Sequence, residues 1–109
     1  MTPDTSTQII KVLVWNGRTV EVRYDPDWCS LSELGPGRQL AHLELQVTEP
    51  PMAPLPVTDT GYRSHFVPVG SVEEAGGPGR YVQAWLEAEA RSPVWRRVEA
   101  RWRQLDLFR

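Results

Sequence analysis

A two-residue turn near the start of the chain constrains the fold most. Asn16-Gly17 is the dipeptide that a type I′ β-turn prefers, because both residues tolerate a positive φ angle. Residues 8–15 before it are rich in β-branched and aromatic side chains, and in residues 18–24 after it apolar and polar side chains alternate. The sequence therefore predicts a β-hairpin with one buried and one solvated face.

A third strand is predicted over residues 39–48, where apolar and polar side chains alternate again. Asp25-Pro26-Asp27 is expected to end the second strand, and residues 49–56, with four prolines, to form an extended polyproline-like connector. Residues 62–67 are compatible with either a short strand or an ordered loop.

Helices are predicted for the rest of the chain. Ser71–Glu74 resembles a capping box that opens a short helix, and residues 80–91 form a second amphipathic helix. Ser92-Pro93 is expected to start a third helix, along which Val94, Val98, Trp102 and Leu105 recur at helical spacing. The predicted fold is a single α+β domain over residues 1–103, a three-stranded antiparallel sheet packed by C-terminal helices, with a tail at residues 104–109.

Composition narrows the class of protein. A chain of 109 residues makes one domain with a modest core, for which the five tryptophans are the first candidates. Cys29 is the only cysteine, so no intramolecular disulfide is expected. Residues 1–7 do not resemble a signal peptide and no run of about 20 apolar residues is present, so we expect a cytoplasmic location.

Charge is distributed unevenly along the chain. Residues 1–92 carry seven basic and twelve acidic side chains, whereas residues 93–109 carry five basic and two acidic ones. This basic end could attract an acidic partner, and a nucleic acid would be contacted by Arg96, Arg97, Arg101 and Arg103. The other interpretation is that these cations complement the negative end of a helix macrodipole.

The segment Gln104-Leu105-Asp106-Leu107-Phe108 resembles the pentapeptide with which bacterial replication and repair proteins bind the DNA polymerase III β sliding clamp. All five positions match the family's pattern, Gln-Leu, then Ser or Asp, then Leu-Phe. The resemblance implies that Gln104 hydrogen-bonds in a smaller clamp subsite and that Leu105 rests between subsites. It also implies that Asp106 stays near solvent, while Leu107 and Phe108 fill a deep apolar subsite.

An alternative interpretation of the same segment stays open. Leu105 continues the apolar stripe of the third predicted helix, so residues 104–108 could be its last turn, with Leu107 and Phe108 packed into the core. Residues 55–66, Gly76-Gly77-Pro78 and the following helix resemble small uncharacterised proteins of alphaproteobacterial chromosomes, plasmids and phages. That resemblance implies a mobile-element setting and no activity.

Catalytic and metal sites have weaker support. Asp59, Tyr62, Arg63 and His65 form a polar-aromatic run that is a candidate surface site. His42, His65 and Cys29 are too few and too scattered for structural zinc, so neither a metal nor a cofactor is expected. We therefore expect a non-enzymatic accessory protein that binds the clamp. The alternatives are a nucleic-acid-associated or partner-binding protein of a mobile element, with a structural C-terminal helix, and an enzyme centred on residues 62–65.

Overall fold

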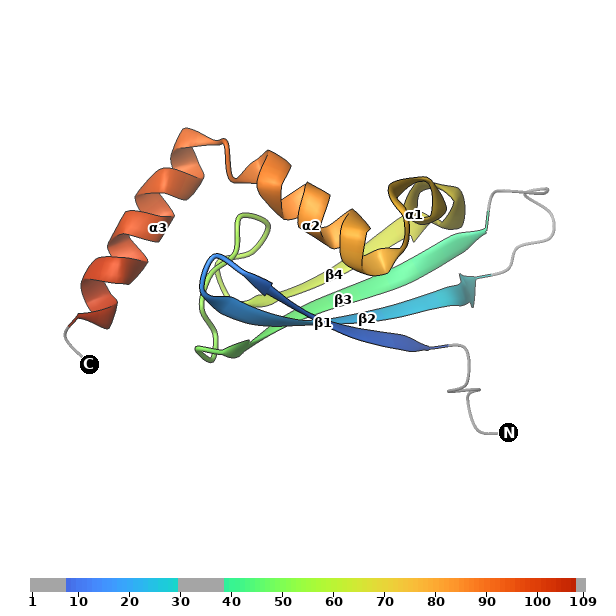
Figure 1. Ribbon diagram of the computed structural model, residues 1–109, viewed down its shortest axis with the longest axis horizontal. Helices are drawn as coiled ribbons and strands as arrows, with labels where there is room; N and C mark the ends of the chain where they lie inside the picture. The colour runs from blue at the N-terminus through green and yellow to red at the C-terminus, as the bar shows by residue number, and fades with distance from the viewer. Residues whose placement is uncertain (1–7, 30–38, 108–109) are drawn as a thin grey trace.

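A computed structural model describes residues 8–29 and 39–107, together with the side chains of all of these except 27–29 and 106. Four antiparallel strands and three helices follow one another along the chain (Figure 1). The strands pair in the order β1-β2-β3-β4. The elements are β1 (Ile9–Trp15), β2 (Arg18–Cys29), β3 (Leu40–Glu49), β4 (Tyr62–Pro68), α1 (Val69–Ala75), α2 (Pro78–Glu89) and α3 (Pro93–Asp106).

The predicted hairpin is confirmed. Trp15 pairs with Arg18 across the turn, and Asn16 and Gly17 have φ angles of 49° and 80°. Both angles lie in the region that a type I′ turn requires. The alternation also holds, since Val20, Val22 and Tyr24 are buried. These side chains begin the core on one face of the sheet.

β2 does not end at Asp25, as the sequence predicted, but continues to Cys29. Its pairing with β3 shifts register between Asp25 and Cys29. An irregularity of this kind accommodates Pro26, because a proline has no N–H to give to a regular ladder.

The sheet is four-stranded, so the prediction of three strands is wrong. β4 pairs antiparallel with β3, with Ala41 opposite Val67 and Leu45 opposite Arg63. On the face of β4 that meets the core only Val67 is apolar and fully buried, while Tyr62 and Phe66 are exposed on the other face. β4 therefore lacks the buried-apolar alternation that identifies β2 and β3 in the sequence.

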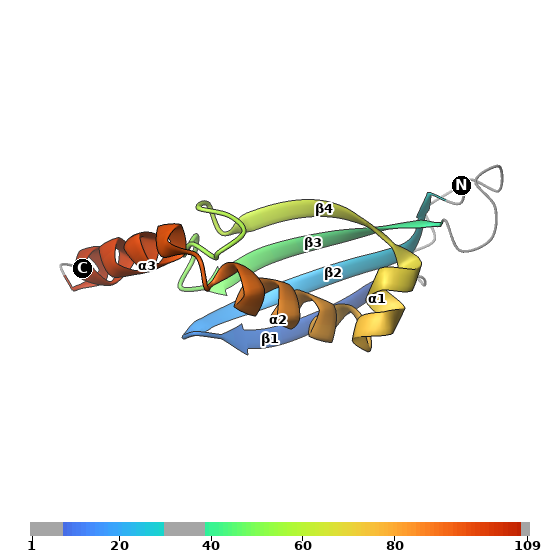
Figure 2. The ribbon, with the colours of Figure 1, turned by 90° about the horizontal axis from the view of Figure 1, so that it is seen from above.

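The core lies between the sheet and the two shorter helices (Figure 2). The predicted inner face of β3 is confirmed, with Ala41, Leu43, Leu45 and Val47 buried. α2 lies across β1 and β2 and contributes Val82 and Leu86, both fully buried. The opposite face of the sheet has no helix over it among the described residues.

Two details of the predicted connections are wrong. α1 begins at Val69 without a side-chain cap, because β4 runs directly into it, so Ser71 is inside the helix rather than at its N-cap. Residues 49–56 are not an extended connector, since Glu49 belongs to β3 and turns fold the following residues back and bury Ala53 and Leu55 in the core. The start of α3 is confirmed, because the Ser92 hydroxyl accepts a hydrogen bond from the Val94 N–H at 3.1 Å.

The molecule is elongated, with extents of 51 × 30 × 19 Å. α3 accounts for much of this length, because it leaves the end of α2 and extends past the hairpin turn (Figure 1). No helix among the described residues is long and apolar enough to cross a membrane.

Candidate partner-binding site

The predicted docking segment lies at the end of α3. The helix runs through Asp106, so Gln104 and Leu105 are helical, as the alternative interpretation expected. The side chains are nevertheless not packed into the domain, since Leu105 is 59% exposed and Leu107 is 82% exposed. Phe108 lies outside the described residues. Two apolar side chains of the motif are therefore presented to solvent.

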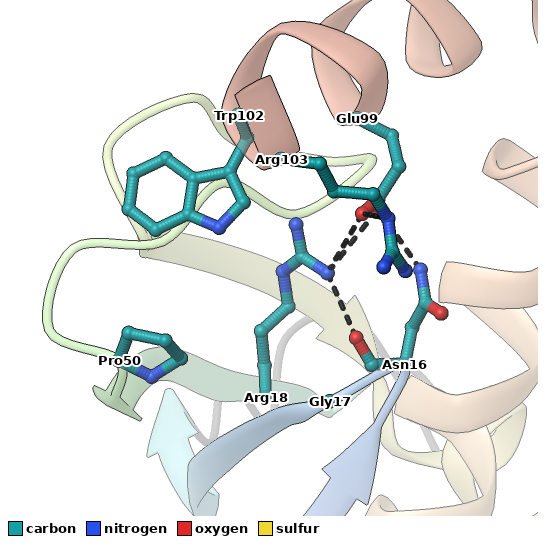
Figure 3. A pocket seen from close by; sticks show the side chains of 7 residues that line it. All are labelled: Asn16, Gly17, Arg18, Pro50, Glu99, Trp102 and Arg103. Carbon is teal, nitrogen blue, oxygen red and sulfur yellow. Dashed lines mark hydrogen bonds and ion pairs between the residues drawn. The ribbon is translucent and has the colours of Figure 1, made fainter. Parts of the chain in front are cut away.

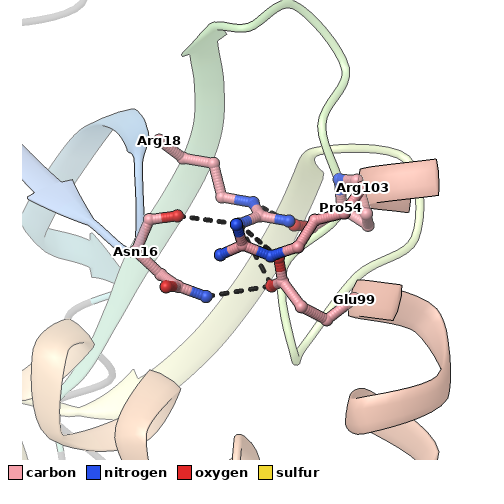
Figure 4. A network of polar contacts seen from close by, with 5 residues as sticks. All are labelled: Asn16, Arg18, Pro54, Glu99 and Arg103. Atoms are coloured by element: carbon pink, nitrogen blue, oxygen red, sulfur yellow. Dashed lines mark hydrogen bonds and ion pairs between the residues drawn. The ribbon is translucent and has the colours of Figure 1, made fainter. Parts of the chain in front are cut away.

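A buried arginine joins α3 to the hairpin. Arg18 is the first residue of β2 and is only 3% exposed. Its Nε donates to the Pro54 carbonyl at 2.8 Å, and its Nη1 donates to the Asn16 carbonyl at 2.8 Å (Figure 4). Arg18 thus ties together the hairpin turn and the loop between β3 and β4.

Glu99 completes this junction from α3. Its Oε2 lies 3.2 Å from Arg18 Nη1 and accepts from Asn16 Nδ2 at 2.9 Å, and its Oε1 accepts from Arg103 Nε at 2.7 Å. Trp95 is buried beneath, its ring 5.7 Å from that of Trp15 and 5.3 Å from Arg18 Cζ. These contacts hold the first two turns of α3 against the hairpin, while the segment that follows Arg103 projects away.

A cavity of about 240 Å³ opens at the junction (Figure 3). The sheet side supplies Asn16, Gly17, Arg18 and Pro50, and α3 supplies Glu99, Trp102 and Arg103. Sequence reasoning did not find this cavity, because Arg18 and Glu99 are far apart in the chain. The only sequence indication was a lone arginine at the position directly after a hairpin turn.

The structure separates the residues of the predicted polar-aromatic site. Strand alternation places Tyr62 on the open face of the sheet and Arg63 and His65 on the face that carries α2, while Asp59 lies in the preceding loop. Tyr62 donates its hydroxyl to Glu44 Oε2 at 2.6 Å, and this hydrogen bond raises the pKa of Tyr62. Asp59, Tyr62 and His65 therefore do not converge on one pocket.

His65 has a packing role in the structure. Its ring lies 4.4 Å from the Trp85 ring, and its Nε2 lies 3.5 Å from the Tyr81 hydroxyl. Burial lowers the pKa of His65, and the neighbouring positive charge of Arg63 lowers it further. Arg63 itself lies over Trp85, with Cζ 5.7 Å from the ring.

Sequence reasoning also missed a cross-strand pair on the open face. His42 Nε2 lies 2.6 Å from Ser64 Oγ, and the His42 ring lies 4.8 Å from that of Phe66. The register of β3 against β4 produces this pair, and that register was not predicted. Across residues 8–29 and 39–107, no group of three or more potential ligands could hold a metal ion.

All four predicted nucleic-acid contacts are exposed on α3. Arg96, Arg97 and Arg101 are exposed, and so is Arg103, although its Nε donates to Glu99. Contact of these arginines with a nucleic acid stays a prediction.

Comparison with known proteins gives one family. No curated protein and no solved structure matches the chain. The family model described as the KlcB third domain matches residues 9–95, which include the whole sheet, α1, α2 and the buried Trp95. The docking segment at residues 104–108 lies outside the matched residues. The chain belongs to the KlcB third-domain family, and this membership suggests an accessory protein of a plasmid or another mobile element.

Proposed function

We propose that this mobile-element accessory protein is non-enzymatic and binds the bacterial DNA polymerase III β sliding clamp, in the cytoplasm, through Gln104–Phe108. The observation that carries the proposal is the exposure of Leu105 and Leu107, at 59% and 82%. The fold does not use these side chains as core, so they are available to a partner. A short peptide obtains most of its binding free energy from such apolar anchors, while one polar group fixes its register.

The segment has to leave the helix in order to bind as an extended peptide. Its last turn is weakly held, since the Leu107 N–H donates to the Arg103 carbonyl at 3.3 Å and the apolar side chains are exposed. Terminal helical turns open at little free-energy cost, because few buried contacts are lost. Unwinding after Arg103 leaves the contacts of Glu99 and Trp95 in place, so the rest of α3 keeps its position.

The resemblance to the motif indicates which clamp subsite each residue would occupy. Gln104 donates and accepts through its amide in the smaller subsite, and Leu107 with Phe108 fills the deep apolar subsite. Ordering a short segment offsets much of its contact energy, so we expect a dissociation constant on the order of 1 μM, about −8 kcal/mol.

Biolayer interferometry with an immobilised, purified bacterial β clamp tests this proposal. The double substitution Leu107→Ala with Phe108→Ala should weaken binding at least about 30-fold, because removing anchors costs about 2 kcal/mol or more. The matched control is Val94→Ala with Arg97→Ala, which alters exposed positions on the same helix outside the segment.

Thermal unfolding of the same variants separates binding from folding. The melting temperature of the Leu107→Ala and Phe108→Ala variant should equal that of the unsubstituted chain. If this variant unfolds at a clearly lower temperature, the segment belongs to the core and the proposal fails. Failure of the unsubstituted chain to bind the clamp would overturn it as well.

A second candidate is a nucleic-acid-associated protein in which the C-terminal segment that follows Arg103 is purely structural. The observation in its favour is the group of exposed arginines, Arg96, Arg97 and Arg101, on a helix that continues to Asp106. If this second candidate is correct, DNA binding should weaken steeply with salt, and glutamine at these three positions should abolish DNA binding. The clamp proposal requires instead that the same triple variant still binds the clamp.

A further inference from the structure

The cavity at the junction of hairpin and α3 contains an arginine atom that nothing in the fold satisfies. Arg18 Nη2 is buried and has no hydrogen-bond partner among the described residues. The other two nitrogens of the same guanidinium donate to Pro54, Asn16 and Glu99. In Figure 3 the terminal nitrogen of Arg18 that has no dashed line points toward α3, into the space between Trp102 and the pair formed by Glu99 and Arg103. A buried N–H without an acceptor is destabilising, so an acceptor placed there would be stabilising.

The charges around the cavity favour an anion. Arg18 and Arg103 each carry one positive charge, and Glu99 carries one negative charge, so the lining has a net charge of +1. The Glu99 carboxylate already has three partners, because its two oxygens accept a hydrogen bond from Asn16 and pair with the guanidinium groups of Arg18 and Arg103. The unused hydrogen-bonding capacity of Arg18 therefore consists of donors, in a setting where burial strengthens electrostatic interactions.

The size of the cavity limits what can enter. At about 240 Å³ it is smaller than the roughly 300–1,000 Å³ of pockets that hold whole cofactors or drug-sized ligands. We propose that it is a binding site for one small oxyanion group, a carboxylate or a phosphate, held by Arg18 Nη2 and by the guanidinium of Arg103. The oxyanion reaches Nη2 by a small displacement of the half-buried Trp102 ring. This site is independent of clamp binding, because it does not use residues 104–108.

An NMR titration of the full chain tests the site with two probes, sodium phosphate and sodium acetate, at constant ionic strength made up with chloride. The Arg18 Nε–H, the Trp102 indole N–H and the Gly17 amide should shift saturably with at least one probe. Arg103→Gln should raise the dissociation constant at least fivefold. Arg97→Gln, which removes an equal charge from a residue of the same helix that does not line the cavity, should leave it unchanged.

Each result has a defined meaning. Saturable shifts with both probes support a general oxyanion site, and shifts with only phosphate or only acetate support the site and identify its chemistry. The proposal is overturned if the three resonances do not move, or if chloride alone moves them equally. It is also overturned if Arg103→Gln binds like the unsubstituted chain while its melting temperature shows that it is folded.

Discussion

Arg18 connects the hairpin, the β3–β4 loop and α3. Its buried guanidinium donates to the carbonyls of Asn16 and Pro54 and pairs with the Glu99 carboxylate. A buried arginine is tolerated only where its charge is compensated, and Glu99 supplies the carboxylate at 3.2 Å. Residues 81 positions apart in the chain thus depend on each other.

The first prediction concerns this pair. Glu99→Gln should lower the free energy of unfolding by about 3 kcal/mol, because it leaves the Arg18 charge buried without its counter-ion. Urea denaturation followed by tryptophan fluorescence measures the change. Glu87→Gln is the control, since Glu87 is exposed on α2 and accepts a hydrogen bond from the exposed Gln83 at 3.3 Å. Equal stability of the two variants would show that Arg18 does not need Glu99.

The second prediction concerns His65. Burial, with a contribution from Arg63, lowers the pKa of His65 in the folded chain below its ordinary value of 6.5. The unfolded chain therefore binds a proton more readily just below pH 6.5, and the free energy of unfolding should fall as the pH decreases through that window. In His65→Gln, equilibrium unfolding at several pH values should show a smaller slope there. An unchanged slope would contradict the attribution of this pH dependence to His65.

At the scale of the elements, the hairpin and β3 could be predicted because their information is local. A turn dipeptide and strict alternation determine which side chains of β2 and β3 face the core. β4 could not be predicted as a strand in the same way, because it presents Arg63 and His65 to the helix face and Tyr62 and Phe66 to solvent. Only the antiparallel pairing of β4 with β3 identifies this segment as a strand.

The same distinction between local and long-range information applies to the candidate site. The docking motif is visible in the sequence because five adjacent residues carry it. The Arg18–Glu99 junction was missed, since its residues come together only when α3 reaches the hairpin. The polar-aromatic run from Asp59 to His65 was predicted as one surface, and strand alternation separates it.

The third prediction concerns the loop between β3 and β4. Gly61 has a φ angle of 81°, and a Cβ there would lie 3.0 Å from the Ala53 carbonyl oxygen. Gly61→Ala should therefore lower the free energy of unfolding by about 1–3 kcal/mol, measured by urea denaturation. Gly70→Ala in α1 is the matched control, since nothing lies within 4 Å of its added Cβ. If both variants are equally stable, the loop does not require a glycine.

At the scale of the whole molecule, α3 differs from the other helices in how it is held. α2 packs along β1 and β2, whereas α3 is anchored at the hairpin end through Trp95, Glu99 and Trp102 and then extends beyond the sheet (Figure 1). The described side chains after Trp102 are exposed, so few buried contacts hold the far end of α3, as is typical of a segment that opens locally.

The fourth prediction follows from this attachment. In native-state hydrogen exchange, amides of α3 beyond Trp102 should exchange far faster than those of β2 and β3 around Val22 and Leu43. Amides near Trp95 should have intermediate protection, because that turn is buried. Protection of residues 104–107 equal to that of the central strands would mean that the segment cannot leave the helix, contrary to the proposed mode of binding.

The most direct test of clamp binding is a competition measurement. A synthetic peptide of residues 103–109 should displace the full chain from a bacterial β clamp completely, with an inhibition constant on the order of 1 μM. A peptide with Leu107→Ala and Phe108→Ala should not displace it. Residual binding of the full chain at saturating peptide would place the contact elsewhere on the domain and contradict the account.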